Sequence, residues 1–233
     1  MRPRSTATSS SGATGSEMKP RVGVFGGAFD PPHNAHVALA GAAMAQRGLT
    51  ELRIFPTGQS WHKARTPSSA EHRLAMAELA FGAMPGVIVD AREIRRDGPT
   101  YTLDTLRELQ REMPDVQLVL MMGSDQARAL PQWHGWRDIL ALSVVCVAER
   151  LESQVPGDAI DPSRDGIEPA IRFDPHTLPG LPAGARFETL ELPAVATSAT
   201  DIRARAARGQ DIARLVPPAV ARYIDRYHLY ASA

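Results

Sequence analysis

Two histidines, His33 and His36, have the residue type and the spacing to bind a polyphosphate. They close the stretch VGVFGGAFDPPHNAH, residues 22–36, in which an apolar run leads through paired glycines to a helix start. Residues three apart on a helix share a face, so both imidazoles would project from the first turn. A helix N-terminus favours an anion there through its dipole and its free N–H groups. The pattern therefore predicts a phosphate site.

The segment before the histidines contains Gly26 and Gly27, which predict a sharp turn and a close approach of a ligand to the backbone. Other motif classes fit less well, because the Rossmann fingerprint G-x-G-x-x-G and the Walker loop are both absent. A zinc site needs a third ligand, and the single cysteine, Cys146, lies in an apolar run. For an isolated H-x-x-H pair, the alternative is one capping histidine and one surface histidine.

Composition limits the other function classes. Lys plus Arg and Asp plus Glu are both 26, so the net charge of zero indicates neither a nucleic-acid partner nor a membrane surface. One cysteine cannot form an internal disulfide, which is typical of a reducing, cytoplasmic protein. No apolar run approaches the roughly 20 residues of a membrane helix. Residues 1–20 are rich in Ser, Gly and Ala, lack an apolar centre, and are predicted to be a disordered tail.

The elements that must position these histidines alternate along the chain. After the first strand, helices are predicted at 34–47, 69–84, 101–113, 199–208 and 217–230, and strands at 52–56, 87–90, 116–122, 143–149 and 187–193. Short apolar runs separated by helices indicate a parallel sheet covered on both faces. The predicted fold is α/β, a doubly wound, Rossmann-like sheet with C-terminal helices. Residues 21–233 form one predicted domain, with an irregular insertion at about 150–186.

Two further segments could contact a polyphosphate. His62 and Lys63 follow the second strand, so they belong beyond the carboxyl ends of the sheet, although a solvated loop would explain them equally. Ser198 and Thr200 stand at a helix start, with Arg203 one turn later. A capped helix with an exposed basic face, including Arg205 and Arg208, is the alternative for that segment.

Two other segments could contact a small organic acceptor. A hydroxyl-rich helix start, Thr100 to Thr102, suits a small carboxylate, although ordinary capping by Thr would also explain it. Asp125 follows a buried strand and could accept hydrogen bonds from ribose, although Ser124 or Asp125 could instead cap a helix. Trp133, next to His134, could stack on an aromatic ring or pack in the core.

GGAFDPPHNAH resembles the H-x-G-H motif of the nucleotidyltransferase superfamily related to class I aminoacyl-tRNA synthetases. All five segments together resemble the bacterial nicotinate mononucleotide adenylyltransferase family. Ala35 stands where the family has Gly, which a helical turn accepts and a positive φ would strain. Ser60-Trp61 precede His62-Lys63 where the family commonly has Pro-Pro.

The resemblance implies transfer of AMP from ATP to nicotinate mononucleotide, assisted by Mg²⁺, in NAD biosynthesis. It implies catalytic roles for His33, His36, Lys63 and Arg203, with no protein metal ligand. It implies ATP contacts at Gly26, Gly27, Phe29, His33, His36, Ser198, Thr200 and Arg203. It implies mononucleotide contacts at His62, Thr100, Tyr101, Thr102, Asp125, Trp133 and His134, in which Asp125 faces the ribose, Trp133 faces the pyridine ring and the Thr100–Thr102 backbone binds the carboxylate.

The motifs favour direct in-line attack by the acceptor phosphate, because that anion is already a nucleophile and no Ser-His-Asp or Cys-His constellation is present. Two other functions stay open. The H-x-x-H motif also serves other nucleotidyltransferases, with nicotinamide mononucleotide, phosphopantetheine or glycerol phosphate as acceptor. A catalytically silent nucleotide-binding regulator is the alternative from another class. The sequence does not indicate an oligomeric state.

Overall fold

Six parallel strands form one sheet in this computed structural model, which describes residues 19–58, 67–150, 172–192 and 197–231. The strand order is β3-β2-β1-β4-β5-β6, so the predicted doubly wound sheet is confirmed. The strands are β1 (Arg21–Gly27), β2 (Glu51–Pro56), β3 (Val87–Val89), β4 (Gln117–Gly123), β5 (Ser143–Arg150) and β6 (Arg186–Leu192).

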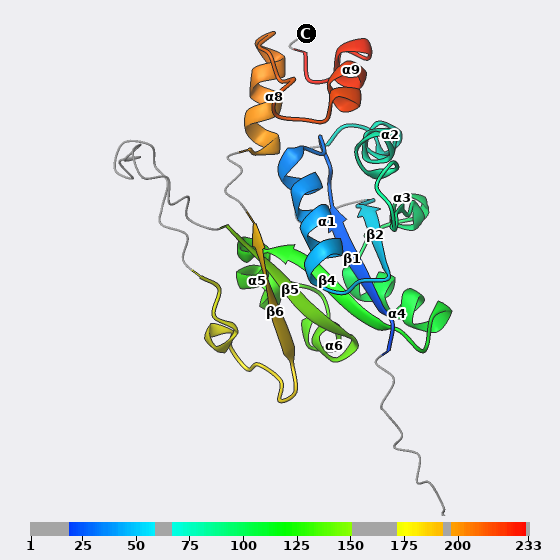
Figure 1. The fold of residues 1–233 in the computed structure, drawn as a ribbon, viewed down its shortest axis with the longest axis vertical. Helices are drawn as coiled ribbons and strands as arrows, with labels where there is room; N and C mark the ends of the chain where they lie inside the picture. Colours follow the sequence, from blue (N-terminus) through cyan, green and yellow to red (C-terminus); the bar gives the residue numbers. More distant parts are fainter. Residues whose placement is uncertain (1–18, 59–66, 151–171, 193–196, 232–233) are drawn as a thin grey trace, which may run out of the picture.

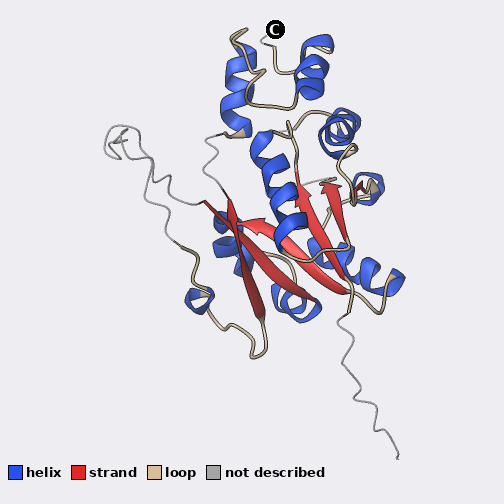
Figure 2. Ribbon diagram, in the orientation of Figure 1, coloured by secondary structure: helices blue, strands red, loops and turns tan. Residues whose placement is uncertain are grey.

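Helices cover both faces of the sheet (Figures 1 and 2). One face carries α1 (Asn34–Gln46) and α2 (Ala70–Phe81). The other face carries α4 (Thr102–Glu112), α5 (Ser124–Ala129) and α6 (Trp136–Leu142). The short α3 (Arg92–Arg95) follows β3. A C-terminal helical unit, α8 (Ala199–Ala207) and α9 (Pro218–Arg226), lies beyond the ends of β1 and β2, at the top of Figure 1.

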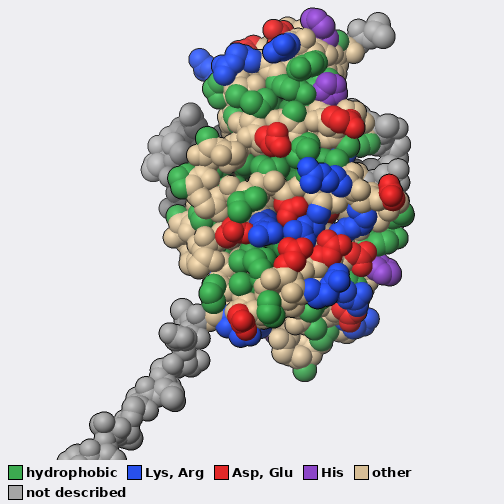
Figure 3. Space-filling view, turned by 90° about the vertical axis from the view of Figure 1, so that its right-hand side faces the viewer, with side chains coloured by type: hydrophobic (Ala, Val, Ile, Leu, Met, Phe, Trp, Pro, Cys, Tyr) green, Lys and Arg blue, Asp and Glu red, His purple; other side chains and the backbone are tan. Residues whose placement is uncertain are grey.

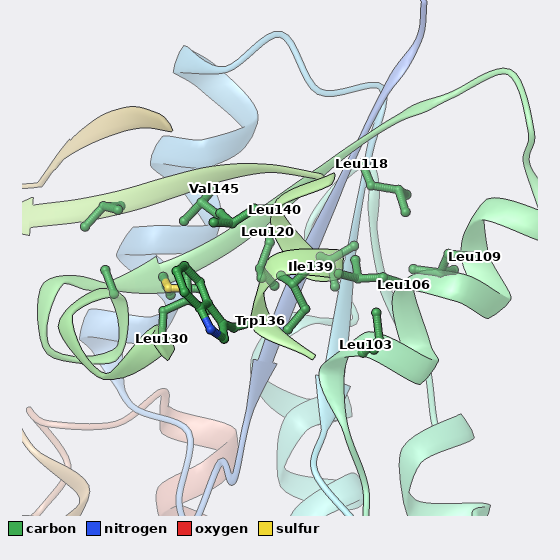
Figure 4. Close-up of a cluster of buried hydrophobic side chains, with 14 of the residues drawn as sticks. Leu103, Leu106, Leu109, Leu118, Leu120, Leu130, Trp136, Ile139, Leu140 and Val145 are labelled. Carbon is green, nitrogen blue, oxygen red and sulfur yellow. The ribbon is translucent and has the colours of Figure 1, made fainter. Parts of the chain in front are cut away.

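The core is split by the sheet because successive strand residues point to opposite faces. In β4, Leu118, Leu120 and Met122 pack toward α4 and α6, whereas Val119 and Met121 pack toward α1. Figure 4 shows the first of these clusters, where leucines of α4 meet Trp136 and Ile139 of α6. Both faces of the central strands are therefore buried, as the uninterrupted apolar runs predicted.

The structure corrects several element boundaries. The helix predicted at 69–84 ends at Phe81, and the one predicted at 217–230 ends at Arg226. Helices α3, α5 and α6 were not predicted, since elements of four to seven residues are too short to show a helical period. Most of the predicted tail and of the predicted insertion at 150–186 lies outside the described residues, so that division of the chain stays a prediction. In the described part of the chain, no helix is long and apolar enough to cross a membrane.

Charged side chains of both signs gather on the face that α3 and α4 share (Figure 3). Arg92 binds both Asp90 and Glu112 at 2.8 Å, and Arg96 binds Glu108 at 2.8 Å. A shallow hollow of about 540 Å³ lies among these residues. The hollow is lined by acidic and basic residues in equal number, and most of them bind each other.

Candidate active site

The segment with the two histidines begins at the carboxyl end of β1, beside β4. The chain winds from β1 toward β2 and β3 on one side and later from β4 toward β5 and β6 on the other. This reversal leaves a crevice at the carboxyl ends of β1 and β4, which is where doubly wound sheets bind ligands. Phe25 pairs with Met121, so Gly27 and Gly123 end their strands at the same level.

The turn after β1 is made at Phe29 and not, as predicted, by the paired glycines. Gly26 and Gly27 belong to the extended strand and neither has a positive φ. Phe29 has φ of 48°, and the following Asp30–Pro31 peptide is cis. Gly27 instead allows the Phe29 ring to pack closely, because a Cβ at Gly27 would meet that ring at 3.1 Å. Gly26 is exposed and has open space around it. We call residues 28–33 the phosphate turn.

His33 and His36 lie stacked at the start of α1. Their ring centroids are 3.7 Å apart with planes 18° from parallel, and the Phe29 ring stands edge-on to His36 at 5.1 Å. The His33 backbone N–H donates to Nδ1 of His36 at 3.2 Å. Burial, and then the neighbouring His33, hold the pKa of His36 well below its ordinary value. His36 is therefore neutral, and accepting at Nδ1 leaves the proton on Nε2 as a hydrogen-bond donor.

The backbone N–H groups at this helix start are largely used within the protein, which corrects the prediction that they are free. The Asn34 N–H donates to Leu215 O at 3.0 Å, and the His36 N–H donates to His33 O at 2.9 Å. The His33 N–H binds the His36 ring. These three donors therefore have intramolecular partners.

Arg203 reaches the phosphate turn from α8. Its guanidinium donates to the main-chain oxygen of Asp30 at 2.8 Å and to Oγ1 of Thr200 at 3.1 Å. Ser198 is the N-cap of α8, accepting from the Asp201 N–H at 3.1 Å, so its hydroxyl has the structural role that was the alternative. The fold thus joins Arg203 and Thr200 to a segment about 170 residues earlier in the chain.

Arg205 and Arg208 lie on the exposed side of the same helix. Arg205 pairs with Asp201 at 2.8 Å, and Arg208 binds Gln210 at 3.1 Å. They form the exposed basic face that the sequence predicted.

The predicted acceptor residues gather at the start of α4. The ring centroids of Tyr101 and His134 lie 4.5 Å apart with planes tilted by 35°, so these two residues are in contact. Tyr101, not a threonine, is the N-cap, and no side chain caps the helix. Thr100 is buried and donates to the main-chain oxygen of Glu93 at 3.4 Å. Thr102 is the first residue of α4.

Asp125 and Trp133 lie on segments that follow β4. Asp125 lies in the first turn of α5 with an exposed carboxylate that Arg128 binds at 3.1 Å. The N-cap of α5 is Gly123, so neither Ser124 nor Asp125 caps that helix. Trp133 is partly buried and packs against the core cluster of α4 and α6. The position of Trp133 is therefore compatible with both alternatives, stacking on an aromatic ring and packing in the core. His62 and Lys63 lie outside the described residues.

Arg73 connects the two halves of the site and was not predicted. It is 3 % exposed, and its guanidinium donates to four main-chain oxygens, those of Ala28, Thr57, Gly58 and Ser68. Gly58 in turn lies against Thr100, since a Cβ there would be 2.8 Å from its hydroxyl. Arg73 thus ties the phosphate turn to the β2 loop and, through Gly58, to the start of α4. Sequence carries little signal for it, because one arginine on an amphipathic helix normally faces solvent.

Comparison with known proteins shows to which family the chain belongs. The family model described as cytidylyltransferase-like matches residues 24–205. A protein of Albidiferax ferrireducens named "Probable nicotinate-nucleotide adenylyltransferase" is 50% identical over 213 residues, which cover 91% of this chain and 99% of that protein. A protein of the same name from Methylibium petroleiphilum is 41% identical over 215 residues, 91% of this chain and 92% of that one. The chain belongs to the nicotinate-nucleotide adenylyltransferase family.

The fold agrees with that family. The solved nicotinic acid mononucleotide adenylyltransferase of Plasmodium falciparum, in complex with NaAD, superimposes with a TM-score of 0.64 at 18% identity, covering 91% of this chain and 97% of that one. The same enzyme complexed with APC gives a TM-score of 0.62 over the same shares. At this identity the likeness concerns the fold.

One departure from the family motif has a clear structural outcome. Ala35, where the family has Gly, lies in the first turn of α1 and has no positive φ. The strain that a positive φ would bring is therefore absent. The other departure, at Ser60 and Trp61, lies outside the described residues.

Glu93 introduces a pH dependence behind the predicted acceptor site. Its carboxylate is 5 % exposed and accepts from Thr105 Oγ1 at 2.7 Å. Burial raises its pKa to about 7, against the opposing effects of Thr105 and Arg96. Because the folded pKa exceeds the unfolded one, this group's stabilisation is full below about pH 4.5 and is lost as pH rises through about 7, a change of about 3 kcal/mol.

We predict that Glu93→Gln removes this dependence. Relative to the native chain, the free energy of unfolding of the variant should rise by about 2.5 kcal/mol between pH 5 and pH 8, measured by urea unfolding at each pH. Glu78→Gln, at an exposed position on α2, is the matched control and should track the native chain. Parallel curves for Glu93→Gln and the native chain would contradict the prediction.

Proposed function

We propose that this chain transfers AMP from ATP to nicotinate mononucleotide, giving nicotinate adenine dinucleotide and pyrophosphate in NAD biosynthesis. The observation that carries the proposal is the stacked His33–His36 pair at the β1–β4 crevice, with Arg203 bound to the same turn. Membership of the nicotinate-nucleotide adenylyltransferase family supports the choice of reaction.

ATP binds with its triphosphate against the phosphate turn. His33, the Nε2–H of His36 and the Arg203 guanidinium supply donors to the phosphate oxygens, and Lys63 is proposed to join them. Gly26, exposed and lacking a side chain, lets the nucleotide approach the end of β1. Gly27, Phe29, Ser198 and Thr200 complete the proposed ATP contacts, with Phe29 holding the His36 ring edge-on.

The reaction needs positioning more than acid–base chemistry. A phosphate oxygen of the acceptor attacks the α-phosphorus of ATP, a new P–O bond forms, and the bond to the β-phosphate breaks to release pyrophosphate. The nucleophile is already an anion, and a neutral His36 cannot serve as a proton donor to the leaving group as readily as an imidazolium. Its Nε2–H instead stabilises charge on the transferring phosphoryl group, which is the usual source of rate in such transfers.

The divalent cation is proposed to be Mg²⁺ and to arrive on ATP. In the described part of the chain, no three His, Cys, Asp or Glu side chains cluster to hold a metal ion. Imidazole and guanidinium donors around the turn suit phosphate oxygens better than they suit a hard cation, which prefers oxygen ligands. The cation would offset phosphate charge, while the chain's own side chains orient the nucleotide.

Nicotinate mononucleotide is proposed to lie at the start of α4. The uncapped N-terminus of that helix, at Thr100, Tyr101 and Thr102, faces the nicotinate carboxylate. His134, Trp133 and Tyr101 contribute aromatic surface to the pyridine ring, Asp125 accepts from the ribose, and His62 belongs to the same set. Location in the cytoplasm stays a prediction.

The sequence offered two alternatives: transfer to another acceptor, and nucleotide binding without catalysis. Pyrophosphate release from ATP, measured with each acceptor in turn, distinguishes them. We expect release with nicotinate mononucleotide and none above background with phosphopantetheine or glycerol phosphate. Release with one of the latter alone would replace the proposed acceptor. ATP binding without release on any acceptor would instead favour the silent regulator.

A further inference from the structure

Asp30, in the phosphate turn, is held by two separate C-terminal segments. The Tyr230 hydroxyl donates to Oδ1 of Asp30 at 2.7 Å, and Arg203 donates to its main-chain oxygen at 2.8 Å. The Ser68 N–H donates to Oδ2 at 3.3 Å. Asp30 is 4 % exposed, so these bonds form away from water, where they constrain position most strongly.

The same C-terminal unit also holds the other side of the phosphate turn. Asn34, the first residue of α1, donates its N–H to Leu215 O at 3.0 Å and its side-chain amide to Arg214 O at 2.9 Å. Residues 31–33 are therefore bracketed by two residues that the C-terminal unit anchors. His33 lies inside that bracket, and His36 stacks on it.

The turn needs such anchoring because its backbone is unfavourable. Phe29 has φ of 48°, a left-handed conformation that bulky residues adopt only when surrounding contacts hold them there. Burial, and then the Asp30 carboxylate, raise the pKa of Tyr230. The phenol thus keeps its proton and donates to Asp30 throughout the neutral pH range.

We propose that Tyr230 is a positioning residue for nucleotidyl transfer, whose hydroxyl holds Asp30 and thereby sets the phosphate turn, with His33 and His36, relative to Arg203. The proposal rests on the proposed function. Tyr230 acts through Asp30 and needs no contact with substrate. Tyr230 and Asp30 are 200 residues apart in the sequence, so the hydrogen bond joins the phosphate turn to a segment that only the fold brings near it.

Tyr230→Phe tests the proposal, because it removes only the hydroxyl. We expect kcat/KM for ATP to fall about tenfold, since the turn loses a hydrogen bond to a charged group and its donors shift from their working positions. Tyr223→Phe is the matched control, because it also removes a partly buried hydroxyl contact of the C-terminal unit, to His72 Nδ1 at 3.0 Å, away from the turn. Its kcat/KM should stay within twofold of the native chain.

Thermal unfolding of both variants separates positioning from stability. A tenfold fall for Tyr230→Phe, assayed well below its Tm, supports the proposal. A kcat/KM within twofold of native overturns it, whether or not Tm falls, and assigns Tyr230 to stability. If the native chain shows no turnover, the proposed function fails, and the Kd for ATP then decides the role of Tyr230. A Kd of Tyr230→Phe that is tenfold weaker than native supports the proposal, and a Kd within twofold of native overturns it.

Discussion

His36→Ala should lower kcat by about 10²-fold or more while leaving the fold intact. The residue supplies a neutral Nε2–H donor whose orientation is fixed by the His33 N–H on Nδ1 and by the edge of Phe29. Loss of one such pre-oriented donor to a developing charge typically costs 10²- to 10³-fold in kcat. Steady-state pyrophosphate release at saturating ATP and mononucleotide measures it.

Two further variants make this result specific. His36→Gln retains a neutral N–H donor, so it should keep more activity than His36→Ala, whereas a role as general acid would leave both variants equally slow. His176→Ala, at an exposed position in the short helical turn Pro175–Thr177, controls for loss of an imidazole and should be fully active. Near-normal turnover of His36→Ala would refute the assigned role.

Arg73→Met should destabilise the protein by about 3 to 5 kcal/mol. The substitution keeps an unbranched chain but removes the donors to Ala28, Thr57, Gly58 and Ser68, leaving main-chain oxygens in a buried site without that partner. For a chain of this size that loss corresponds to a fall in Tm of about 6 to 20 °C by differential scanning calorimetry.

Charge and hydrogen bonding can be separated at the same position. Arg73→Lys keeps the charge but cannot span four oxygens with a planar fork, so its Tm should lie between those of the native chain and Arg73→Met. Arg95→Met, on an exposed arginine of α3, should change stability by no more than about 0.5 kcal/mol. A Tm for Arg73→Met within 2 °C of native would show that the bonds of Arg73 contribute little, against the expectation above.

Local pattern was sufficient for most of the fold. The strands around Val119 and Val145 are short apolar runs, and Gly48 marks the end of α1 with a φ of 59°. The six-stranded parallel sheet follows from their alternation with helices. The local pattern also predicted that His33 and His36 lie together, but His33 is the extended N-cap residue before α1, and only His36 lies in the first helical turn.

What escaped prediction depends on long-range contacts. Phe29 makes the turn that Gly26 and Gly27 were expected to make, because the neighbouring Asp30 is anchored from Tyr230 and Arg203. In the sequence Arg73 is indistinguishable from a solvent-facing arginine, because its partners lie in the phosphate turn and in the β2–α2 connection. No local spacing encodes such contacts, since each joins residues that only the folded sheet brings together.

The acceptor assignment is the central claim, and kcat/KM for nicotinate mononucleotide against nicotinamide mononucleotide tests it most directly. Charge-assisted hydrogen bonds from the start of α4 to a carboxylate would be worth roughly 1.5 to 3 kcal/mol, which allows a discrimination of about ten- to a hundredfold in kcat/KM. We predict a preference of that size for nicotinate mononucleotide. A clear preference for the amide would contradict the assignment.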